Sequence, residues 1–113
     1  VEVATGAVTT LAGSGTLGSA DGVGGAEQFN SPSDLAISPD GSVLFVADMF
    51  NHQIRRVEVA TGEVTTLAGS GEAGSVDGLG EAAQFTNPKE VAISPDGSTL
   101  LVSSRGGLRQ VCV

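Results

Sequence analysis

The stretch LAISPDGSVLFVADMFNHQIRRVEVATGEVTTLA, residues 35–68, alternates short apolar runs with turn signals and decides the fold. Its apolar runs predict four strands, at residues 35–38, 43–47, 53–59 and 64–68. Valine, isoleucine and leucine dominate these runs, and β-branched residues suit a pleated, packed surface. The chain has 40% hydrophobic residues but no Trp or Tyr, so its core must be largely aliphatic.

Tight turns separate these strands. A PDGS sequence places Asp40 and Gly41 in a turn with a positive φ at the glycine, and a second PDGS does the same with Asp96 and Gly97. The ATGE sequence at residues 60–63 predicts a further hairpin turn. Four antiparallel strands joined by turns are typical of a β-propeller blade.

The individual strands differ in the burial that their sequences predict. The unbroken apolar run at residues 43–47 predicts a strand buried on both faces. The half-polar run at residues 64–68 suits an outer strand. In the third strand Ile54 and Val57 fall on opposite faces, so its alternation is imperfect.

The chain repeats itself. The sequence VEVATGAVTTLAGSG at residues 1–15 returns as VEVATGEVTTLAGSG at residues 57–71, an offset of 57 − 1 = 56. Near the end the second copy is about two residues shorter, because IRRVEV at residues 54–59 matches LRQVCV at residues 108–113. The sequence therefore predicts an all-β β-propeller fold with two four-stranded antiparallel blades, as an incomplete ring or a segment of a larger assembly.

The phase of the repeat divides the chain into three parts. Residues 1–31 are the outer strands of a preceding blade and a Gly-rich link. Residues 32–87 form a complete blade plus its link, and residues 88–113 hold the inner strands of the next blade.

Each link is the sequence GSGTLGSADGVGGAEQF or its counterpart GSGEAGSVDGLGEAAQF. A phosphate-binding loop would occur once and would carry a Lys-Ser/Thr pair, whereas this stretch recurs without one. We expect the links to cross each blade, with a single helical turn ended by Pro32 and Pro88. Phe29 and Phe85 are predicted to anchor the links to the core.

The sequence PSDLAISPDGSVLFVADMFNHQIRRV, residues 32–57, resembles an NHL repeat: an apolar strand, an Asp-Gly turn, VAD, then Asn-His and an Ile-Arg pair. The resemblance covers essentially the whole chain and implies a β-propeller, commonly six-bladed, whose faces bind proteins, RNA or other ligands. It also implies that Asp48, Asn51, His52 and Arg55 form the structural motif of the blade. The second copy departs from this pattern, because Ser104 replaces the aspartate and the Asn-His pair has no clear counterpart.

The chain carries few candidates for chemistry. His52 is the sole histidine, whereas propeller enzymes related to this family coordinate metals with several His, Asp or Glu residues from different blades. Asp21 and Asp77 precede Gly and are interpreted as turn residues, because the alternating acids of a calcium loop are missing. Asp34 and Glu90 occupy equivalent inner-strand positions, where paired carboxylates would hint only weakly at a cation. No catalytic, cofactor or metal site is therefore assigned, and the protein is predicted not to be an enzyme.

Charge narrows the possible partners. Five Lys and Arg against thirteen Asp and Glu give a net charge of −8, which argues against nucleic acid and against an RNA-binding role. No apolar run is long enough to cross a bilayer, so no membrane insertion is expected. Arg55, Arg56 and Arg109 are predicted to extend over strand faces with their charged ends in water. Cys112 is interpreted as a small strand hydrophobe, with a disulfide to another segment as the alternative.

Two blades do not close a ring, and an isolated pair would leave apolar faces in water. Three arrangements fit: a piece of a longer repeat protein, a subunit of which three copies give six blades, or a segment of an open filament. The sequence thus predicts a non-enzymatic scaffold or protein-binding module, whose acidic, Gly- and Ser-rich composition favours an extracellular location. The alternative is a fragment of a metal-dependent, lyase- or lactonase-like propeller enzyme whose site lies in other blades.

Overall fold

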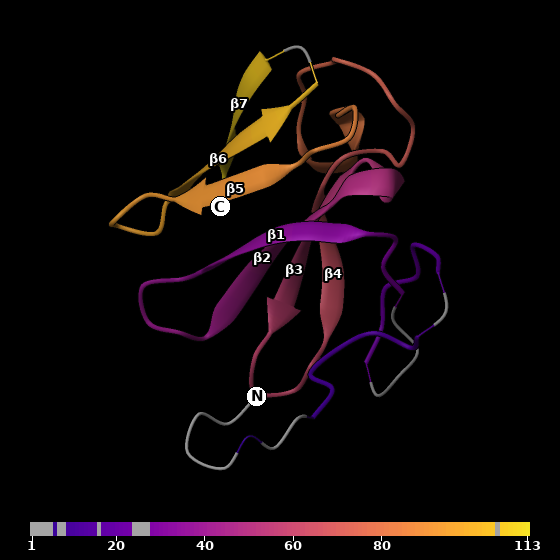
Figure 1. The fold of residues 1–113 in the computed structure, drawn as a ribbon. Coiled ribbons are helices and arrows are strands. Elements are labelled where there is room, and N and C mark those ends of the chain that lie inside the picture. The colour runs from indigo at the N-terminus through magenta and orange to yellow at the C-terminus, as the bar shows by residue number, and fades with distance from the viewer. Residues whose placement is uncertain (1–5, 7–8, 16, 24–27, 106) are drawn as a thin grey trace.

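Two antiparallel sheets lie face to face in the computed structural model, which describes residues 6, 9–15, 17–23, 28–105 and 107–113 (Figure 1). The first sheet has the strand order β1-β2-β3-β4, with the bounds β1 (Pro32–Ile37), β2 (Val43–Asp48), β3 (Gln53–Glu58) and β4 (Val64–Ala68). The second has the order β5-β6-β7, with the bounds β5 (Glu90–Ile93), β6 (Thr99–Ser104) and β7 (Gly107–Cys112). Two short 3-10 helices, η1 (Met49–Asn51) and η2 (Gly80–Ala82), complete the elements of the described residues.

The four strands expected at residues 35–68 agree with β1 to β4 to within a few residues at their ends. The second blade was predicted to have four strands, but the second sheet of the described residues has three. The reason is the phase of the repeat: Val113 corresponds to Val59, one hairpin turn ahead of the equivalent of β4.

Hydrogen bonds within the PDGS turns explain why β1 ends at Ile37 and β2 begins at Val43. Asp40 Oδ1 accepts hydrogen bonds from the Ser42 N–H at 3.0 Å, the Ser42 hydroxyl at 2.7 Å and the Ser38 hydroxyl at 2.8 Å. These bonds, the Ser42 N–H first, lower the pKa of the Asp40 carboxyl from 3.8 to about 2. Gly41 takes a φ of 77°, which only glycine adopts at little cost.

The second turn repeats the first. Asp96 accepts hydrogen bonds from the hydroxyls of Ser94 and Ser98 and from the Ser98 N–H. The hydroxyl of Ser94 is the main cause that lowers the Asp96 pKa from 3.8 to about 2. Gly97 has the same φ of 77° as its counterpart.

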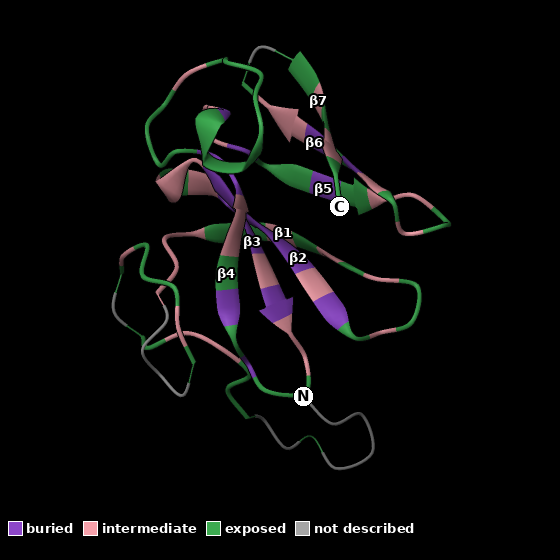
Figure 2. Cartoon of the chain, turned by 180° about the vertical axis from the view of Figure 1, so that it is seen from behind, coloured by how far each residue is buried: buried purple, intermediate pink, exposed green. Residues whose placement is uncertain are grey.

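The main core lies between the two sheets, where buried residues of both face one another (Figure 2). Phe45 and Ile54 of the first sheet meet Leu100 and Val102 of the second there. A smaller cluster, built on Val46, Val57 and Val64, covers the opposite face of the first sheet. Both faces of β3 are therefore packed, which explains its imperfect alternation.

The links differ in part from expectation. η2 ends at Ala82 because the backbone of Ala83 is extended, so Pro88 does not end the helical turn as predicted. The corresponding turn before Pro32 lies largely outside the described residues. Phe85 is buried in the main core, whereas Phe29 is half-buried against the smaller cluster. Pro88 is buried and Pro32 is exposed.

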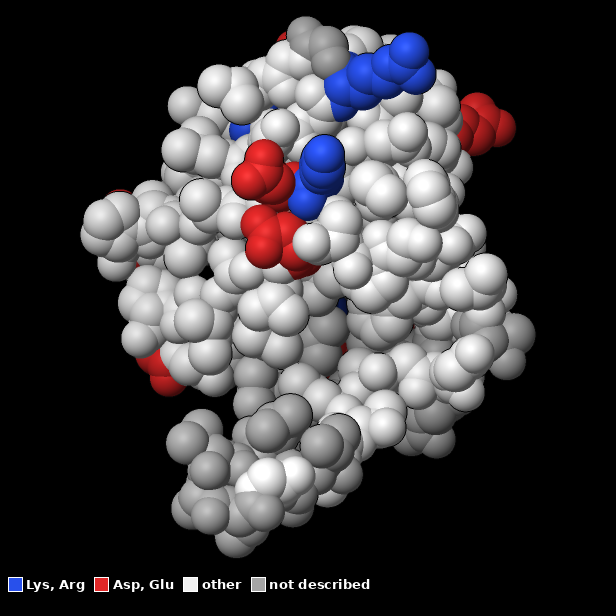
Figure 3. Space-filling model, viewed as in Figure 1, with Lys and Arg blue, Asp and Glu red and all other residues white. Residues whose placement is uncertain are grey.

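On the face shown in Figure 3, charged side chains stand singly or in a small mixed group on a largely uncharged surface. No helix within the described residues is long and apolar enough to cross a membrane.

Candidate functional site

The most extensive polar cluster surrounds Arg55 at the centre of β3. Its Nη1 donates to Asp48 Oδ2 at 2.8 Å and to the Gln28 carbonyl at 2.7 Å. Its Nη2 donates to Asp21 Oδ1 at 2.8 Å and to the Ala20 carbonyl at 2.9 Å. The guanidinium also lies 5.3 Å from the ring centroid of Phe29. One arginine therefore fastens the first link to the first blade.

Arg109 on β7 does the same for the second link. It donates to Asp77 Oδ1 at 2.6 Å and to the carbonyls of Gln84 and Val76. Its guanidinium lies 5.2 Å from the ring centroid of Phe85. We call these two clusters the arginine clamps.

The clamps correct the prediction that arginines extend over strand faces toward water. Arg55 is fully buried, and Arg109 is held by the link, so the prediction is wrong for both. Arg56 is half-exposed and pairs with Glu58. The aspartates before Gly in the links were interpreted as turn residues only, and their ion pairs were missed. The sequence did hold a signal, because an Asp-Gly in each link recurs together with an arginine in each third strand.

Asp48 connects the first clamp to the corner between β2 and β3. Its carboxylate is fully buried and accepts hydrogen bonds from the Asn30 N–H and from Asn51 Nδ2, in addition to Arg55. Asn51 also donates to the Gly18 carbonyl at 2.6 Å. The second clamp lacks this carboxylate, because Ser104 occupies the equivalent position. The structure thus brings together three of the four motif residues in one network.

His52 lies apart from that network and faces the second blade. Its backbone is left-handed at φ 56°, and its Nδ1 accepts a hydrogen bond from the Asn87 N–H at 3.0 Å. Asn87 directly precedes Pro88, at the entry to β5. The sole histidine therefore joins one blade to the next.

Asp34 on the inner strand makes a second contact between blades. Its Oδ2 accepts from the Val91 N–H at 3.1 Å, and the neighbouring Ser33 hydroxyl donates to the Lys89 carbonyl at 2.7 Å. Glu90, its repeat counterpart, is exposed. The described residues contain no group of three or more His, Cys, Asp or Glu side chains that could hold a metal ion.

The outward face of the second blade is the counterpart of a face that is buried in the first. Leu101 and Leu108 correspond to Phe45 and Ile54, which the second sheet covers. Phe45 and Ile54 are 1% and 0% exposed, whereas Leu101 and Leu108 are 52% and 85% exposed. The contact between the two blades therefore shows how another blade would cover this outward face.

The outward face of the first blade is likewise the counterpart of a face that is buried in the second blade. Leu35 and Ile37 correspond to Val91 and Ile93 of β5, which pack into the main core. Leu35 is 56% exposed, whereas Val91 is 8% exposed. The two outward faces are therefore the two halves of the contact that joins the blades internally. We call them the end faces.

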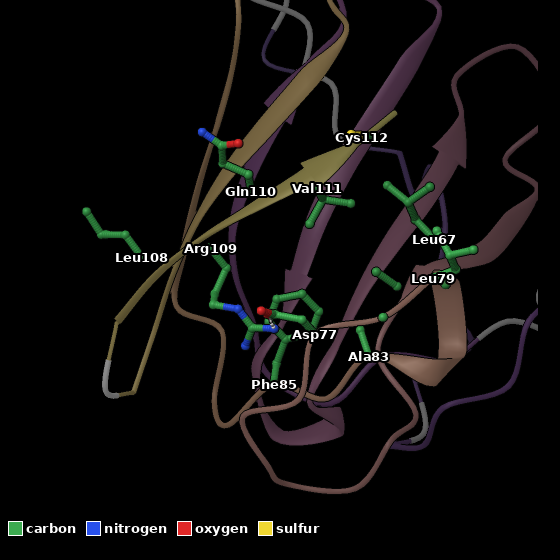
Figure 4. Close-up of a pocket in the computed structure, with 13 residues that line it drawn as sticks. Leu67, Asp77, Leu79, Ala83, Phe85, Leu108, Arg109, Gln110, Val111 and Cys112 are labelled. Atoms are coloured by element: carbon green, nitrogen blue, oxygen red, sulfur yellow. Dashed lines mark hydrogen bonds and ion pairs between the residues drawn. The ribbon is translucent and has the colours of Figure 1, made fainter.

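A hollow of about 500 Å³ lies beside β7, between that strand and the second link (Figure 4). Leu67, Leu79 and Val111 line it, and Arg109 reaches from β7 to Asp77 beside Phe85. In the first blade the same place is filled by β4. That strand pairs with β3 on one side and exchanges backbone hydrogen bonds between Val64 and Gly22 of the first link on the other.

Sequence comparisons find NHL-repeat proteins. The chain is 32% identical over 88 residues to NHL repeat-containing protein 2 of Homo sapiens, covering 77% of the chain and 12% of that protein. The chain belongs to the NHL-repeat β-propeller family. It is also 33% identical over 92 residues to Protein SUPPRESSOR OF QUENCHING 1, chloroplastic, of Arabidopsis thaliana, covering 81% of the chain and 9% of that protein. The chain spans about a tenth of the length of these relatives, and no family model matches it.

Solved structures support the NHL-type propeller fold. An auxiliary nutrient binding protein of Bacteroides ovatus matches with a TM-score of 0.75 at 23% identity, over 86% of the chain and 26% of that protein. A similarly described protein of Bacteroides thetaiotaomicron matches with a TM-score of 0.69 at 26% identity, over 80% of the chain and 24% of that protein. The prediction of an all-β propeller of the NHL type is confirmed.

Proposed function

We propose that this NHL-type segment is a non-enzymatic scaffold and protein-binding module, and that its end faces receive neighbouring blades. The observation that supports this proposal most directly is the difference in exposure between two repeat-equivalent residues. Leu101, on an end face, is 52% exposed, whereas Phe45, between the two sheets, is 1% exposed. Apolar surface of this kind gains about 25 cal/mol for each Å² removed from water. The end faces therefore favour contact with another blade.

The use of the charged side chains supports the same proposal. The arginine clamps hold the links on the blades, and Asp34 and His52 hold one blade on the next. These side chains therefore stabilise the contacts within a repeat and between neighbouring repeats. The neighbouring blades belong to the same longer chain or to other copies. The acidic composition argues against nucleic acid as a partner and favours an extracellular location.

A chain lengthened by one repeat tests the proposal. Val113 has the repeat phase of Val59, so residues 60–113 appended after it supply the equivalent of β4, a link and three further strands. Stability in repeat proteins is a sum of unit and neighbour-contact terms. We expect the longer chain to unfold at a higher guanidinium chloride concentration, as followed by circular dichroism.

The matched control carries Leu101→Glu in the original second blade of the lengthened chain. This substitution places a charge on the contact that the added blade would bury, so most of the gain in midpoint should disappear. A lengthened chain with the same midpoint as the original would contradict the proposal, and so would a Leu101→Glu lengthened chain that keeps the whole gain.

A further inference from the structure

Two buried side-chain atoms of β3 have no hydrogen-bond partner among the described residues. They are Gln53 Oε1 and Arg55 Nε. Gln53 is 7% exposed and Arg55 is fully buried. Buried polar atoms in folded proteins are nearly always hydrogen-bonded to protein or to ordered water. One acceptor and one donor, both buried on the same strand, therefore require a physical explanation.

The Nε–H is the last free donor of Arg55. A guanidinium carries five N–H groups. Its Nη1 donates to Asp48 and to the Gln28 carbonyl. Its Nη2 donates to Asp21 and to the Ala20 carbonyl. The first arginine clamp thus satisfies four donors and leaves the fifth inside the protein, where a polar group without a hydrogen bond is costly.

The two unpaired atoms belong to the same face of the first sheet. Gln53 and Arg55 are two residues apart on β3, so their side chains leave the strand on one side. Asp48 of β2 stands directly opposite Gln53 in the register and is ion-paired with Arg55. Directly opposed residues have Cβ atoms about 4.5–5.5 Å apart. The free acceptor and the free donor therefore both lie beside one buried carboxylate.

That carboxylate has room for a further hydrogen bond. Asp48 Oδ2 accepts from Asn51 and from Arg55, whereas Oδ1 accepts one bond within the described residues, from the Asn30 N–H. A carboxylate offers about four lone-pair sites. Three polar groups thus surround one place: an amide oxygen, a carboxylate oxygen and a guanidinium N–H.

We propose that this place binds one internal water molecule, which accepts from Arg55 Nε and donates to Gln53 Oε1 and Asp48 Oδ1. The ligand must both donate and accept, so neither a metal cation nor an acceptor-only anion satisfies the set. Two residues of a strand span about 6.6 Å. One water, with hydrogen bonds of about 2.7–3.0 Å on each side, bridges a gap of this order. Buried waters typically make about three such bonds.

The water site joins the groups that hold the two links. Arg55 binds the first link, as described above. Gln53 lies against the second link, because a Cβ on Gly71 would be 3.5 Å from Gln53 Nε2. The bridge between Gln53 and Arg55 therefore connects both links through β3. This role goes beyond the proposed function and does not involve the end faces.

The second clamp lacks the residues for such a site. Asp48 and Gln53 are an opposed pair in the first sheet. Ser104 and Gly107 are the corresponding pair in the second sheet. They provide neither the carboxylate nor the amide oxygen. The water site is therefore expected in the first blade of this chain and not in the second.

Water-to-protein nuclear Overhauser effects in the nitrogen-15-labelled chain test the proposal. An internally bound water gives an effect of opposite sign to that of rapidly exchanging surface water, and the proton to observe is Arg55 Nε–H. Gln53→Met removes the amide oxygen with a side chain that is also unbranched. The control Thr66→Val removes the hydroxyl that donates to Asp21 in the same clamp, which could relay exchange with the solvent.

We expect the bound-water signal at Arg55 Nε–H in the parent and in Thr66→Val, and its loss in Gln53→Met. Gln53→Met should also unfold at a lower guanidinium chloride concentration, because Arg55 loses its bridge. An acceptor that had no partner at all would instead be replaced with a gain in stability. A parent without the signal, a signal that persists in Gln53→Met or is lost in Thr66→Val, or an unfolding midpoint of Gln53→Met at or above that of the parent would each overturn the inference.

Discussion

Removing Arg55 should destabilise the chain far more than removing Arg109, although the two arginines are repeat equivalents. Arg55→Leu leaves Asp48, which is fully buried, without the cation that it faces at 2.8 Å. Breaking a buried ion pair from one side costs about 3–5 kcal/mol, because the remaining charge stays out of water. Arg109→Leu leaves only Asp77, which is 95% exposed and stays hydrated. Its loss, mainly two carbonyl hydrogen bonds, should be about 1–2 kcal/mol.

The assay is guanidinium chloride unfolding followed by circular dichroism, with the free energy extrapolated to water. A loss of this size is a large part of the stability of a small domain, so a local measurement should accompany it. The Gln28 N–H donates to the Ala20 carbonyl within the clamped link, and its hydrogen exchange should accelerate strongly in Arg55→Leu.

The double variant Asp48→Asn with Arg55→Leu separates the buried charge from lost packing. Because it removes both charges, we expect it to be more stable than Arg55→Leu alone. Two results would refute this reasoning: equal losses for Arg55→Leu and Arg109→Leu, or a double variant whose loss equals the sum of the single losses.

Three further predictions concern the joints of the repeat. Gly69→Ala should cost more in unfolding free energy than Gly15→Ala, because both residues have positive φ but only the Gly69 Cβ would lie 2.5 Å from the His52 carbonyl oxygen; equal costs would contradict the packing. The substitution His52→Asn is compatible with the left-handed backbone but removes the imidazole nitrogen that accepts the Asn87 N–H. It should lower the free energy of unfolding by about 1 kcal/mol and speed the hydrogen exchange of that amide. An unchanged exchange rate would contradict this contact between the blades. The pKa of Asp40 and Asp96 is lowered to about 2 in the folded chain from 3.8, so their stabilisation is complete above pH 3.8 and is lost as the pH falls toward 2. In the double variant Asp40→Asn with Asp96→Asn, the free energy of unfolding should fall less steeply with decreasing pH over that interval. A fall as steep as that of the parent would contradict the stabilising role of these two carboxylates in the turns.

The strands were predictable because each is short, aliphatic and bounded by turn residues with a known conformational preference. The PDGS turns illustrate this, since Asp40 and Gly41 carry their roles in local chemistry alone. The fold followed from the repeat, because one blade cannot bury both of its faces without neighbours.

The arginine clamps were not predictable in the same way. Arg55 and Asp21 are 34 residues apart, and their contact depends on the path of the link. The sequence analysis expected Arg55 to extend over a strand face into water, whereas the first link covers it in the structure. The end of η2 was likewise set by the extended backbone of Ala83 and the core position of Phe85, ahead of Pro88.

The central claim is that the end faces are the unfilled halves of the internal contact between blades. Light scattering across a range of protein concentrations measures this directly, because the chain has a mass of 11.2 kDa and each added copy raises the molar mass by that amount. We predict multiples of this mass for the parent chain and a shift toward the monomer for Leu101→Glu. The control Phe50→Glu, at an exposed apolar residue of η1 between β2 and β3, should behave as the parent. A folded chain that stays monomeric at every concentration would contradict the account.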